Sequence, residues 1–409
     1  MTLLPVSEAQ VRLLDRTAVL EDEPVGIAKA VNRWTTRDIR AKRTQPAVDL
    51  SAMDGYAVRH ADMPGPWRIV GESAAGGGYA LTVQSGEAVR IYTGATVPDG
   101  ADTVVIQEDV SREGDTLTYA DEESTPKGKN IRRAGSDFSE GQVLIPAGTR
   151  LTARHIALAT LAGHSEIALT RRPRIAILST GSELVRPGQA TGPSQIPASN
   201  GAMLSAMLAH LPCAVTDLGI IKDDLGALTD ALASVANHDL IISTGGASVG
   251  DHDLVKPALD AAGGNIDFWK IRMRPGKPLI AGKLGNALFL GLPGNPVSAY
   301  VTATLFMMPL VRKMLACSAP LPATCMAKLG TDMPAVGGRD DYVRAVLEGG
   351  MARPVVSQDS AATYALSLAN CLIRRAAGSP AAQAGEAAEV VLLDTRLVPG
   401  WFLYVPCSF

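Results

Sequence analysis

The feature that most constrains the fold is a regular alternation of short apolar runs with amphipathic stretches, from Arg174 to about residue 318. Runs such as RIAILST, DLIISTGG and ALFLGL have the length and continuous apolarity of strands that are buried on both faces. Stretches such as SNGAMLSAMLAHL, with Ser199 or Asn200 as its N-cap, have helical spacing. This alternation predicts a three-layer α/β/α domain with a mostly parallel sheet over residues 173–318.

The remainder of the chain is poorer in such alternation. Residues 4–45 have helical spacing on both sides of a Pro-Val-Gly break at 24–26, and residues 150–163 predict a helix that ends at Gly163. Residues 46–137 contain short β-like runs cut by Gly and Pro, which predict a β-rich module. Residues 319–409 include the runs DYVRAVLE, EVVLLD and WFLYVPC and predict a second β-rich domain, similar to a barrel.

The composition excludes several classes of function. The chain has 38 Lys and Arg against 41 Asp and Glu, a formal net charge of −3, which argues against a protein that coats nucleic acid or an anionic membrane. With only 4 Trp, 8 Tyr and 6 Phe, base-stacking platforms and aromatic carbohydrate clefts are poor candidates. The five cysteines form no C-x-x-C pair, which argues against a disulfide framework or a cysteine zinc site and is typical of a reducing, cytoplasmic environment.

No segment has the pattern of a signal peptide or of a membrane span. Charges at Glu8, Arg12, Asp15 and Arg16 leave no apolar h-region of useful length near the N-terminus. Residues 285–311 carry no charge, but the Gly and Pro residues in their first half would break a spanning helix. We therefore predict a buried strand, a turn and a buried helix there.

Polar and glycine residues gather in the loops that follow the predicted strands of the α/β domain. In open parallel sheets, ligands bind beyond the C-terminal ends of the strands. After ILST comes Thr180-Gly181-Ser182-Glu183, and after DLGII comes Lys222-Asp223-Asp224. After IIST comes Thr244-Gly245-Gly246-Ala247-Ser248-Val249-Gly250, followed by Asp251 and Asp253. After KIRM comes Arg274-Pro275-Gly276-Lys277-Pro278, and after FLGL comes Gly291-Leu292-Pro293-Gly294-Asn295-Pro296-Val297-Ser298. Their expected convergence on one sheet edge makes that edge the candidate site.

Charged residues of both signs occur in or beside these loops. The acidic ones are Glu183, Asp223 and Asp253, and the basic ones are Lys270, Arg274 and Lys277. Carboxylates are oxygen ligands suited to a hard cation such as Mg²⁺, and the glycine-rich turns can point backbone N–H groups at an anion. A divalent metal opposite a basic cluster is the arrangement that phosphoryl or nucleotidyl chemistry requires.

Each of these features also has a purely structural explanation. The Thr-Gly-Gly turn at 244–246 can be a tight connection between a strand and a helix, and GLPGNP lacks the Gly-Lys-Ser/Thr end of a P-loop. Asp251 or Asp253 can be the N-cap of the next helix, and Lys270 can extend from an apolar strand to the surface. His252 has no second histidine near it in the sequence, so a zinc site is unsupported.

Three turn-like motifs lie outside the α/β domain: SAMDGYA at 51–57, YTGA at 92–95, and NIRR at 130–133 followed by Gly135 and Asp137. An Asp-Gly pair favours a turn by itself. Taken alone, each motif is explained more simply as a turn than as a catalytic site.

Taken together, the motifs resemble those of one family. SAMDGYA, YTGATVPDGADTVV, NIRRAGSDFSEGQVL, STGSELV, SNGAML, GIIKDD, STGGASVGDHD, RPGKPL, GLPGNPVSA and GRDDYVRA occur in this order. On these ten motifs, which span nearly the whole chain, the sequence resembles the molybdopterin molybdenumtransferase family, called MoeA in bacteria and including the C-terminal domain of gephyrin. Only the part from Arg174 to Cys317 is shared with the adenylyltransferase of the same pathway.

The resemblance implies the last step of molybdenum cofactor synthesis, in which molybdate and adenylylated molybdopterin give the molybdenum cofactor and AMP with the help of Mg²⁺. It also implies an elongated homodimer with four domains per chain. These would be a helical dimerisation domain from 1–45 and 138–172, a β-rich module at 46–137, the molybdopterin-binding α/β domain at 173–318 and the barrel-like domain at 319–409. The active cleft is expected between the α/β domain of one subunit and the β-rich modules of the other.

Carried over position by position, the resemblance assigns roles to individual residues. Asp54, Thr93 and Asp137 are expected to reach the cleft from the β-rich module of the second subunit, as catalytic residues. Glu183, Asp223 and Asp253 are expected to be both catalytic residues and metal ligands. The residues expected to bind substrate or molybdate are Thr180, Gly181, Gly245, Gly246, Ser248, Lys270, Arg274, Lys277, Pro278, Ser298, Arg339 and Ser360, with Ser367 as the alternative to Ser360.

Two positions depart from the family pattern. Arg274 stands before Pro-Gly-Lys, where the family tends to have a second Lys or Arg, so the charge is kept as a planar guanidinium. Asp359 stands in Gln358-Asp359-Ser360 where the family often has Gln-Gly-Ser, and it adds negative charge near the expected anion pocket.

Two other functions agree with parts of the sequence. An adenylyltransferase-like enzyme would share the α/β domain, but the SAMDGYA and RPGKP segments argue against it. A non-catalytic scaffold, like gephyrin in receptor clustering, would need added partner-binding regions, which we do not expect here. The expected partners are a second copy of the chain, the molybdopterin adenylyltransferase and proteins that deliver the cofactor to molybdoenzymes, with no nucleic acid and no membrane.

Overall fold

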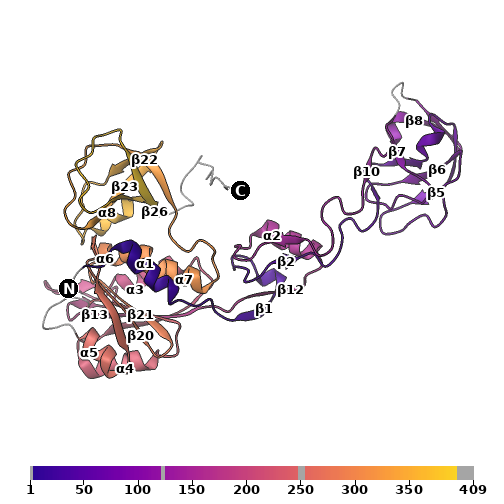
Figure 1. Cartoon of the computed structure of the whole chain (residues 1–409). Coiled ribbons are helices and arrows are strands. Elements are labelled where there is room, and N and C mark those ends of the chain that lie inside the picture. Colours follow the sequence, from indigo (N-terminus) through magenta and orange to yellow (C-terminus); the bar gives the residue numbers. More distant parts are fainter. Residues whose placement is uncertain (1–2, 121–124, 247–253, 394–409) are drawn as a thin grey trace.

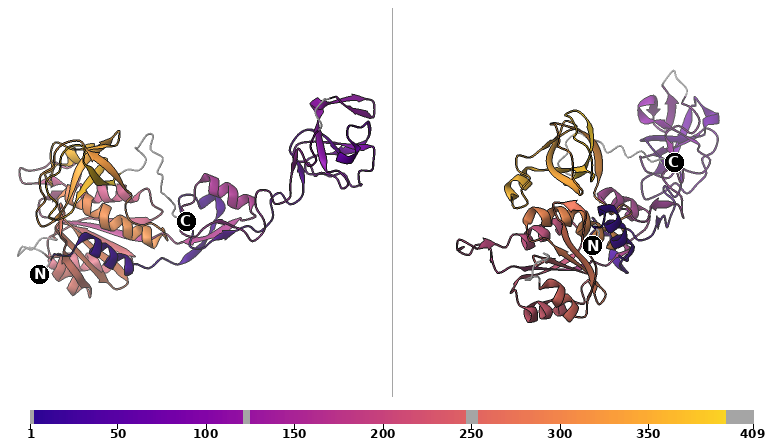
Figure 2. Two further views of the ribbon diagram at one scale, coloured as in Figure 1. Left: turned by 45° about the horizontal axis from the view of Figure 1, so that its top comes forward. Right: turned by 60° about the vertical axis from the view of Figure 1, so that its left-hand side comes forward.

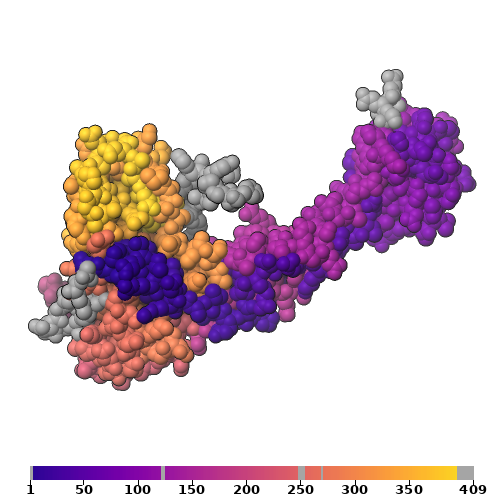
Figure 3. All heavy atoms as spheres, in the orientation of Figure 1, coloured from indigo at the N-terminus to yellow at the C-terminus, as the bar shows by residue number. Residues whose placement is uncertain are grey.

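The computed structural model describes residues 3–120, 125–246 and 254–393. The molecule is elongated (Figure 1; Figure 2). One end holds an α/β domain (residues 174–315 together with the N-terminal helix) and a β-barrel (residues 324–392). A middle domain (residues 22–45 and 138–170) forms a narrow arm that leads to a distal module (residues 46–134) at the other end (Figure 3).

The α/β domain is built on a six-stranded sheet in the order β16-β13-β17-β21-β20-β18. Its strands are β13 (Arg174–Thr180), β16 (Ala214–Ile221), β17 (Leu240–Thr244), β18 (Asn265–Lys270), β20 (Pro278–Leu284) and β21 (Ala287–Leu292). β16, β13, β17 and β21 pair in parallel, and β20 is antiparallel to both β21 and β18. All residues of β17 and β21 are buried, as expected for strands with both faces covered.

Helices cover the two faces of this sheet. One face packs on α1 (Val6–Asp15), α3 (Asn200–Leu208), α6 (Pro296–Thr302), the π-helical turn η4 (Ala303–Met307) and α7 (Met308–Met314), and the other packs on α4 (Leu225–Ser234) and α5 (Val255–Ala261). Successive strand residues alternate between the faces, so that Ile177 contacts the first set of helices and Leu178 the second. The predicted three-layer α/β/α architecture is confirmed.

The barrel closes as a ring of five strands. They are β22 (Thr324–Leu329), β23 (Asp340–Glu348), β24 (Met351–Pro354), β25 (Cys371–Arg375) and β26 (Ala387–Leu392), with helix α8 (Thr363–Leu368) between β24 and β25. The pairings run β23-β24-β22-β26-β25 and return to β23. A two-residue strand of the α/β domain, β19 (Met273–Arg274), pairs in parallel with β23 and joins the barrel to that domain.

The middle domain consists of two small antiparallel pairs and one helix. β1 (Asp22–Gly26) pairs with β12 (Glu166–Thr170), β2 (Ile39–Arg40) pairs with β11 (Val143–Ile145), and α2 (Ala153–Leu161) and the 3-10 turn η1 (Ile27–Lys29) complete it. Val25, Ile39, Leu151 and Leu169 lie in its core. Gly163, with φ +96°, follows the end of α2 as predicted.

The prediction of a helix over residues 27–42 is wrong, because the only helical element there is the single turn η1, and Ile39–Arg40 form strand β2. Asn32 has a left-handed φ of +66°, and its N–H donates to the carbonyl of Leu151 at 2.8 Å. Trp34 then bridges Arg150 in antiparallel fashion. The backbone therefore bonds to a segment that is remote in the sequence, and a helix cannot use the same groups.

The distal module contains a six-stranded sheet in the order β7-β4-β6-β5-β9-β8. The strands are β4 (Gly55–Val58), β5 (Trp67–Ser73), β6 (Glu87–Ile91), β7 (Thr103–Ile106), β8 (Val110–Glu113) and β9 (Thr116–Tyr119), and a short pair joins β3 (Leu50–Ser51) to β10 (Ile131–Arg132). Two 3-10 turns, η2 (His60–Asp62) and η3 (Gln107–Asp109), connect strands. Trp67 and Leu117 are fully buried in its core.

Within the described part of the chain, no helix combines the length and the apolarity needed to cross a bilayer. The uncharged residues 285–311 contain strand β21 and the buried run of α6 and η4, as predicted. The strand expected over residues 401–407 lies outside the described residues.

Candidate active site

The structure places the candidate loops of the α/β domain along one edge of the central sheet. The parallel strands β16, β13, β17 and β21 all end there, and Thr244 pairs with Leu292 at the ends of β17 and β21. The antiparallel strand β20 begins at that edge, where Pro278 lies opposite Lys270 at the end of β18. All six strands therefore contribute to the same edge.

The acidic and basic candidates occupy opposite halves of this edge. Glu183 and Asp223 follow β13 and β16, whereas Lys270 and Lys277 flank β18 and β20 at the other side of the strand order. Adjacent strands lie about 4.8 Å apart, so the steps from β16 to β18 span roughly 24 Å. The edge therefore suits an extended ligand with chemically different ends.

Gly245 and Gly246 form the tight turn after β17. Their φ angles of +86° and +61° lie in the left-handed region, where glycine is favoured. A Cβ atom on Gly245 would overlap the carbonyl oxygen of Thr180, and one on Gly246 would lie 2.6 Å from Cγ2 of Val255. The close packing of the strand ends is therefore enough to require glycine at both positions, without any role in ligand binding. Ser248, later in the same loop, lies outside the described residues.

Two buried oxygen atoms beside this turn, Thr180 Oγ1 and Asn200 Oδ1, have no hydrogen-bond partner among the described residues. The Asn200 amide donates from Nδ2 to the carbonyl of Gly294 at 2.7 Å, so it links α3 to the loop after β21. A buried polar atom without a partner costs about 1–3 kcal/mol, and a polar ligand or a bound water would remove this cost.

The sequence identified Asn200 only as a helix cap, and its contact with the loop after β21 was missed. Ser199 is the N-cap of α3 and makes no side-chain hydrogen bond there. The only signal in the sequence was the position of Asn200 in the SNGAML motif.

The carboxylates Glu183 and Asp223 are both exposed. The Glu183 side chain folds back over Gly181, where a Cβ atom would lie 2.7 Å from its Oε2. Asp224 caps helix α4 by accepting from the N–H of Ala227 at 2.9 Å, so Asp223 is not needed for that task.

These carboxylates, which follow two adjacent strands, suit a hard cation such as Mg²⁺, because such an ion prefers oxygen donors. Among residues 3–120, 125–246 and 254–393, no three His, Cys, Asp or Glu side chains come close enough to hold a metal. The third expected ligand, Asp253, lies outside those ranges.

A loop of the barrel reaches the start of helix α6. The hydroxyl of Ser360 accepts from Nδ2 of Asn295 at 3.0 Å, and its carbonyl accepts from the N–H of Val297 at 3.3 Å. Ser298 is buried in the first turn of α6. Ser367 instead donates to the carbonyl of Tyr364 within α8, so Ser360 is the serine that contacts the α/β domain.

Arg344 holds this loop in place. Its side chain is 1 % exposed, and its guanidinium donates to the carbonyls of Asp359 and Ser357, both at 3.0 Å. Burial lowers the pKa of Arg344, and the Asp359 charge opposes that change. Asp359 itself accepts from the N–H of Ala361 at 2.7 Å, so part of its added negative charge is used in the turn.

Basic residues from two domains meet where β19 pairs with β23. Arg274 lies opposite Asp341 in this pairing, and Arg339 precedes β23. Burial raises the pKa of Asp341, while the charges of Arg274, Arg339 and Arg375 oppose the rise. The sequence did not single out Asp341, although it lies in the GRDDYVRA motif.

Lys277 is exposed beside this junction, in the loop between β19 and β20. Lys270 lines a groove of about 780 Å³ between the start of α1 and strand β18. Leu4, Glu8 and Lys256 also line this groove.

In the distal module, Asp54 and Thr93 lie in contact. Asp54 Oδ1 accepts from the N–H of Thr93 at 2.7 Å and from its hydroxyl at 2.8 Å. These two bonds, together with the nearby charge of Arg90, lower the pKa of the exposed Asp54 carboxyl. Arg90 also stacks on the rings of Tyr56 and Tyr92, 5.0 Å from each centroid.

Within one chain, the pair formed by Asp54 and Thr93 does not reach the sheet edge. The module that carries it lies at the far end of the molecule from the central sheet (Figure 1). Asp137 lies on the connection between this module and the middle domain, where its N–H donates to the carbonyl of Gln45 at 3.1 Å. The expected site residues thus form two groups in the single chain.

Three family models match the chain. They are the MoeA N-terminal region (domain I and II) at residues 4–163, the probable molybdopterin binding domain at residues 176–313 and the MoeA C-terminal region (domain IV) at residues 326–393. Together they cover the middle domain and distal module, the α/β domain and the barrel.

Curated relatives and solved structures agree with these matches. The chain is 38 % identical over 318 residues to the molybdopterin molybdenumtransferase of Haemophilus influenzae, covering 76 % of this chain and 78 % of the relative. It is 32 % identical over 425 residues to that of Bacillus subtilis, covering 98 % and 96 %. The crystal structure of the molybdopterin biosynthesis moeA protein from Pyrococcus horikoshii is 28 % identical, with a TM-score of 0.85 over 98 % of this chain and 100 % of that one. The chain therefore belongs to the molybdopterin molybdenumtransferase family.

Proposed function

We propose that this protein is a transferase that inserts molybdenum from molybdate into molybdopterin, and that it releases AMP from adenylylated molybdopterin in doing so. The observation that carries the proposal is the sheet edge itself. It presents carboxylates at one half, and basic groups together with the barrel loop at the other.

The basic half suits molybdate, a tetrahedral oxyanion with two negative charges. Arg274, Arg339 and Lys277 supply positive charge around the junction of β19 and β23. The planar guanidinium of arginine can donate two parallel hydrogen bonds to an oxyanion. Ser360, held by Arg344 and Asn295, adds a hydroxyl at a fixed position. Binding molybdate there before the reaction would hold the metal oxyanion next to the dithiolene of the substrate.

The acidic half suits the phosphoanhydride of the adenylylated substrate with Mg²⁺. Glu183 and Asp223, with Asp253, would hold the ion through carboxylate oxygens. When bound, Mg²⁺ stabilises negative charge on the phosphate oxygens as AMP leaves. The residues of the chain bind and orient the two substrates along the roughly 24 Å of the edge, so that adenylyl release and metal insertion occur in one complex.

The distal module completes the site from a second copy of the chain. Asp54 is kept ionised by Thr93 and is exposed, but it cannot reach the sheet edge of its own chain. In a homodimer of such elongated chains, the module of one subunit can lie over the sheet edge of the other.

The assay uses the purified chain, adenylylated molybdopterin and molybdate, with and without Mg²⁺. Chromatography measures AMP, and mass spectrometry measures molybdenum bound to molybdopterin. We expect both products only when molybdate is present, and at least tenfold less of each without Mg²⁺. AMP release without molybdenum insertion would contradict the proposal. A separate reaction supplies molybdopterin and ATP in place of the adenylylated substrate, and formation of adenylylated molybdopterin there would indicate an adenylyltransferase. Binding of AMP or molybdate without turnover would indicate a scaffold.

A further inference from the structure

The middle domain joins the α/β domain through two short chain segments. One is residues 16–21, between α1 and β1, and the other is residues 171–173, between β12 and β13. Because β1 and β12 pair with each other, both segments leave the α/β domain together as one ribbon (Figure 1). The direction in which the arm leaves the domain therefore depends on a small number of contacts at this neck.

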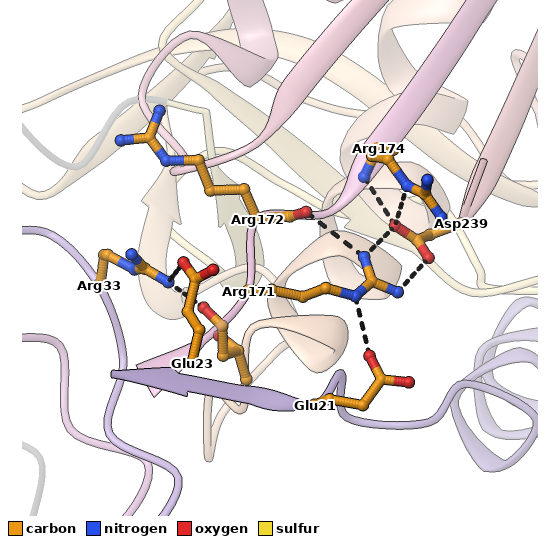
Figure 4. A network of polar contacts seen from close by, with 8 residues as sticks. Glu21, Glu23, Arg33, Arg171, Arg172, Arg174 and Asp239 are labelled. Atoms are coloured by element: carbon orange, nitrogen blue, oxygen red, sulfur yellow. Dashed lines mark hydrogen bonds and ion pairs between the residues drawn. The ribbon is translucent and has the colours of Figure 1, made fainter. Parts of the chain in front are cut away.

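One aspartate links the neck to the central sheet (Figure 4). Asp239 lies just before β17, and its carboxylate accepts from both terminal nitrogens of the Arg171 guanidinium, each at 2.7 Å. The same carboxylate accepts from the backbone N–H of Arg174 at 2.7 Å. Such a bidentate pair fixes direction as well as distance.

The backbone of Asp239 is itself anchored between two strands of the sheet. Its N–H donates to the carbonyl of Arg174 at 2.8 Å, and its carbonyl accepts from the N–H of Leu288 at 3.0 Å. Its side chain is 11 % exposed, so water competes little for the pair. The carboxylate is thus a rigid reference point on the α/β domain.

Arg171 connects this reference point to the other segment of the neck. Its Nε donates to Glu21 at 2.8 Å, and its backbone N–H donates to the carbonyl of Glu21, also at 2.8 Å. The guanidinium therefore touches both connecting segments and the sheet at once. Glu21 is 78 % exposed, so its side-chain bond is open to solvent, unlike the bond of Asp239.

We propose that Asp239 is a positioning residue of the molybdenum transfer reaction, which acts through Arg171 by setting the angle between the arm and the α/β domain. The proposal rests on the proposed function, in which Asp54 and Thr93 serve the sheet edge of a second subunit. A small rotation at the neck moves the distal module by that angle multiplied by the length of the arm. A site shared between two elongated chains therefore needs a fixed neck.

Several other contacts cross the neck. Arg16 pairs with Asp267 of β18, Arg150 donates from Nη2 to the carbonyl of His210 at 3.3 Å, and the N–H of Leu20 donates to the carbonyl of Met314 at 3.0 Å. The Ser318 hydroxyl donates to the carbonyl of Gly148 at 3.5 Å, and Trp34 packs in the hydrophobic cluster of the α/β domain. Among the described residues at the neck, only the pair of Arg171 and Asp239 is bidentate. Asp239 also lies outside the hydrophobic clusters of the domain, so a change there does not open a core.

The test compares three variants of the full-length chain. Asp239→Asn keeps the shape of the side chain and removes its charge. Arg171→Lys keeps the positive charge but removes the two parallel N–H donors of the guanidinium. It serves as a second variant should Asp239→Asn fold poorly. Glu21→Gln is the matched control, because it alters the exposed partner of the same arginine.

Pulsed electron paramagnetic resonance measures a distance between the α/β domain and the distal module that changes with the angle at the neck. Spin labels are introduced through a noncanonical amino acid at Asp230 in α4 and Ser111 in β8, and excess unlabelled chain isolates the distance within one chain. We expect Asp239→Asn and Arg171→Lys to widen the distance distribution at least twofold, and Glu21→Gln to leave it within the wild-type width.

Turnover and binding are then measured on the same proteins. We expect Asp239→Asn and Arg171→Lys to lower kcat at least tenfold while the Kd for AMP stays within twofold, since the sheet edge is intact. Unchanged distance distributions in both variants would overturn the proposal, as would widened distributions with wild-type kcat. A wild-type chain without any turnover would refute the proposed function, and the distances would still decide whether this pair sets the angle.

Discussion

At the scale of single residues, the chemistry of this chain depends on partners that are remote in the sequence. Asp54 takes its two hydrogen bonds from Thr93, and Asn200 is linked to Gly294. The family resemblance selected Asp54 and Thr93 as candidates, whereas their residue types alone indicated only turns. Neither source selected Asn200 or Asp341. In Asn200 the relevant property is a buried oxygen that has no partner among the described residues, and in Asp341 it is burial among arginines. Such properties arise only after folding.

The contact between Asp54 and Thr93 predicts a measurable pH effect. Thr93 lowers the pKa of Asp54, so the carboxyl stays ionised below the ordinary aspartate value of about 3.9. In Thr93→Val the hydroxyl donor is lost, and we expect the titration midpoint of Asp54 to rise toward that value, as followed by carbon NMR of labelled aspartate. Thr93→Ser keeps the hydroxyl and should keep the low midpoint. A midpoint that is the same in Thr93→Val and wild type would show that the hydroxyl does not stabilise the charge.

At the scale of secondary structure elements, the pattern of apolar residues predicts which strands and helices are buried. Strands such as β17 and β21 are buried at every position, and their continuous apolar runs identified them. The same method failed for residues 27–42, where helical spacing was present. The left-handed Asn32 and its bond to Leu151 connect that segment to residues more than a hundred positions away. Local periodicity contains no information about such pairing.

The barrel loop that carries Ser360 gives an element-scale prediction. Arg344→Met keeps the length of the side chain but leaves the carbonyls of Ser357 and Asp359 without their donor. We expect a loss of about 1–3 kcal/mol in the free energy of unfolding by urea, and at least a tenfold rise in the molybdate concentration needed for half-maximal turnover.

Lys328→Met is the matched control, because it removes an exposed basic side chain from strand β22 of the same barrel. Both quantities should stay close to wild type in that variant. Equal behaviour of the two variants would mean that Arg344 does not hold the loop for substrate binding.

At the scale of the whole molecule, the arrangement of the domains separates two groups of candidate residues. The order of elements along the chain predicted an α/β domain flanked by β-rich parts, and the structure agrees. The direction of the arm could not be predicted, because it depends on the pairing of β1 with β12 and on contacts at the neck between residues that are remote in the sequence, such as Arg171 with Asp239 and Arg16 with Asp267. The near-neutral total charge likewise conceals a sheet edge with an acidic half and a basic half.

The central claim is that one active site contains residues of two chains, and complementation between inactive variants tests it most directly. Asp54→Ala disables the distal module, and Lys277→Ala disables the sheet edge, so each variant alone should show little turnover. After unfolding and refolding the two together, random pairing gives about half mixed dimers with one intact site each, and we expect about a quarter of wild-type turnover. Native mass spectrometry confirms that mixed dimers have formed. Mixed dimers without recovered turnover would contradict the claim, because a site built within one chain remains damaged in both subunits.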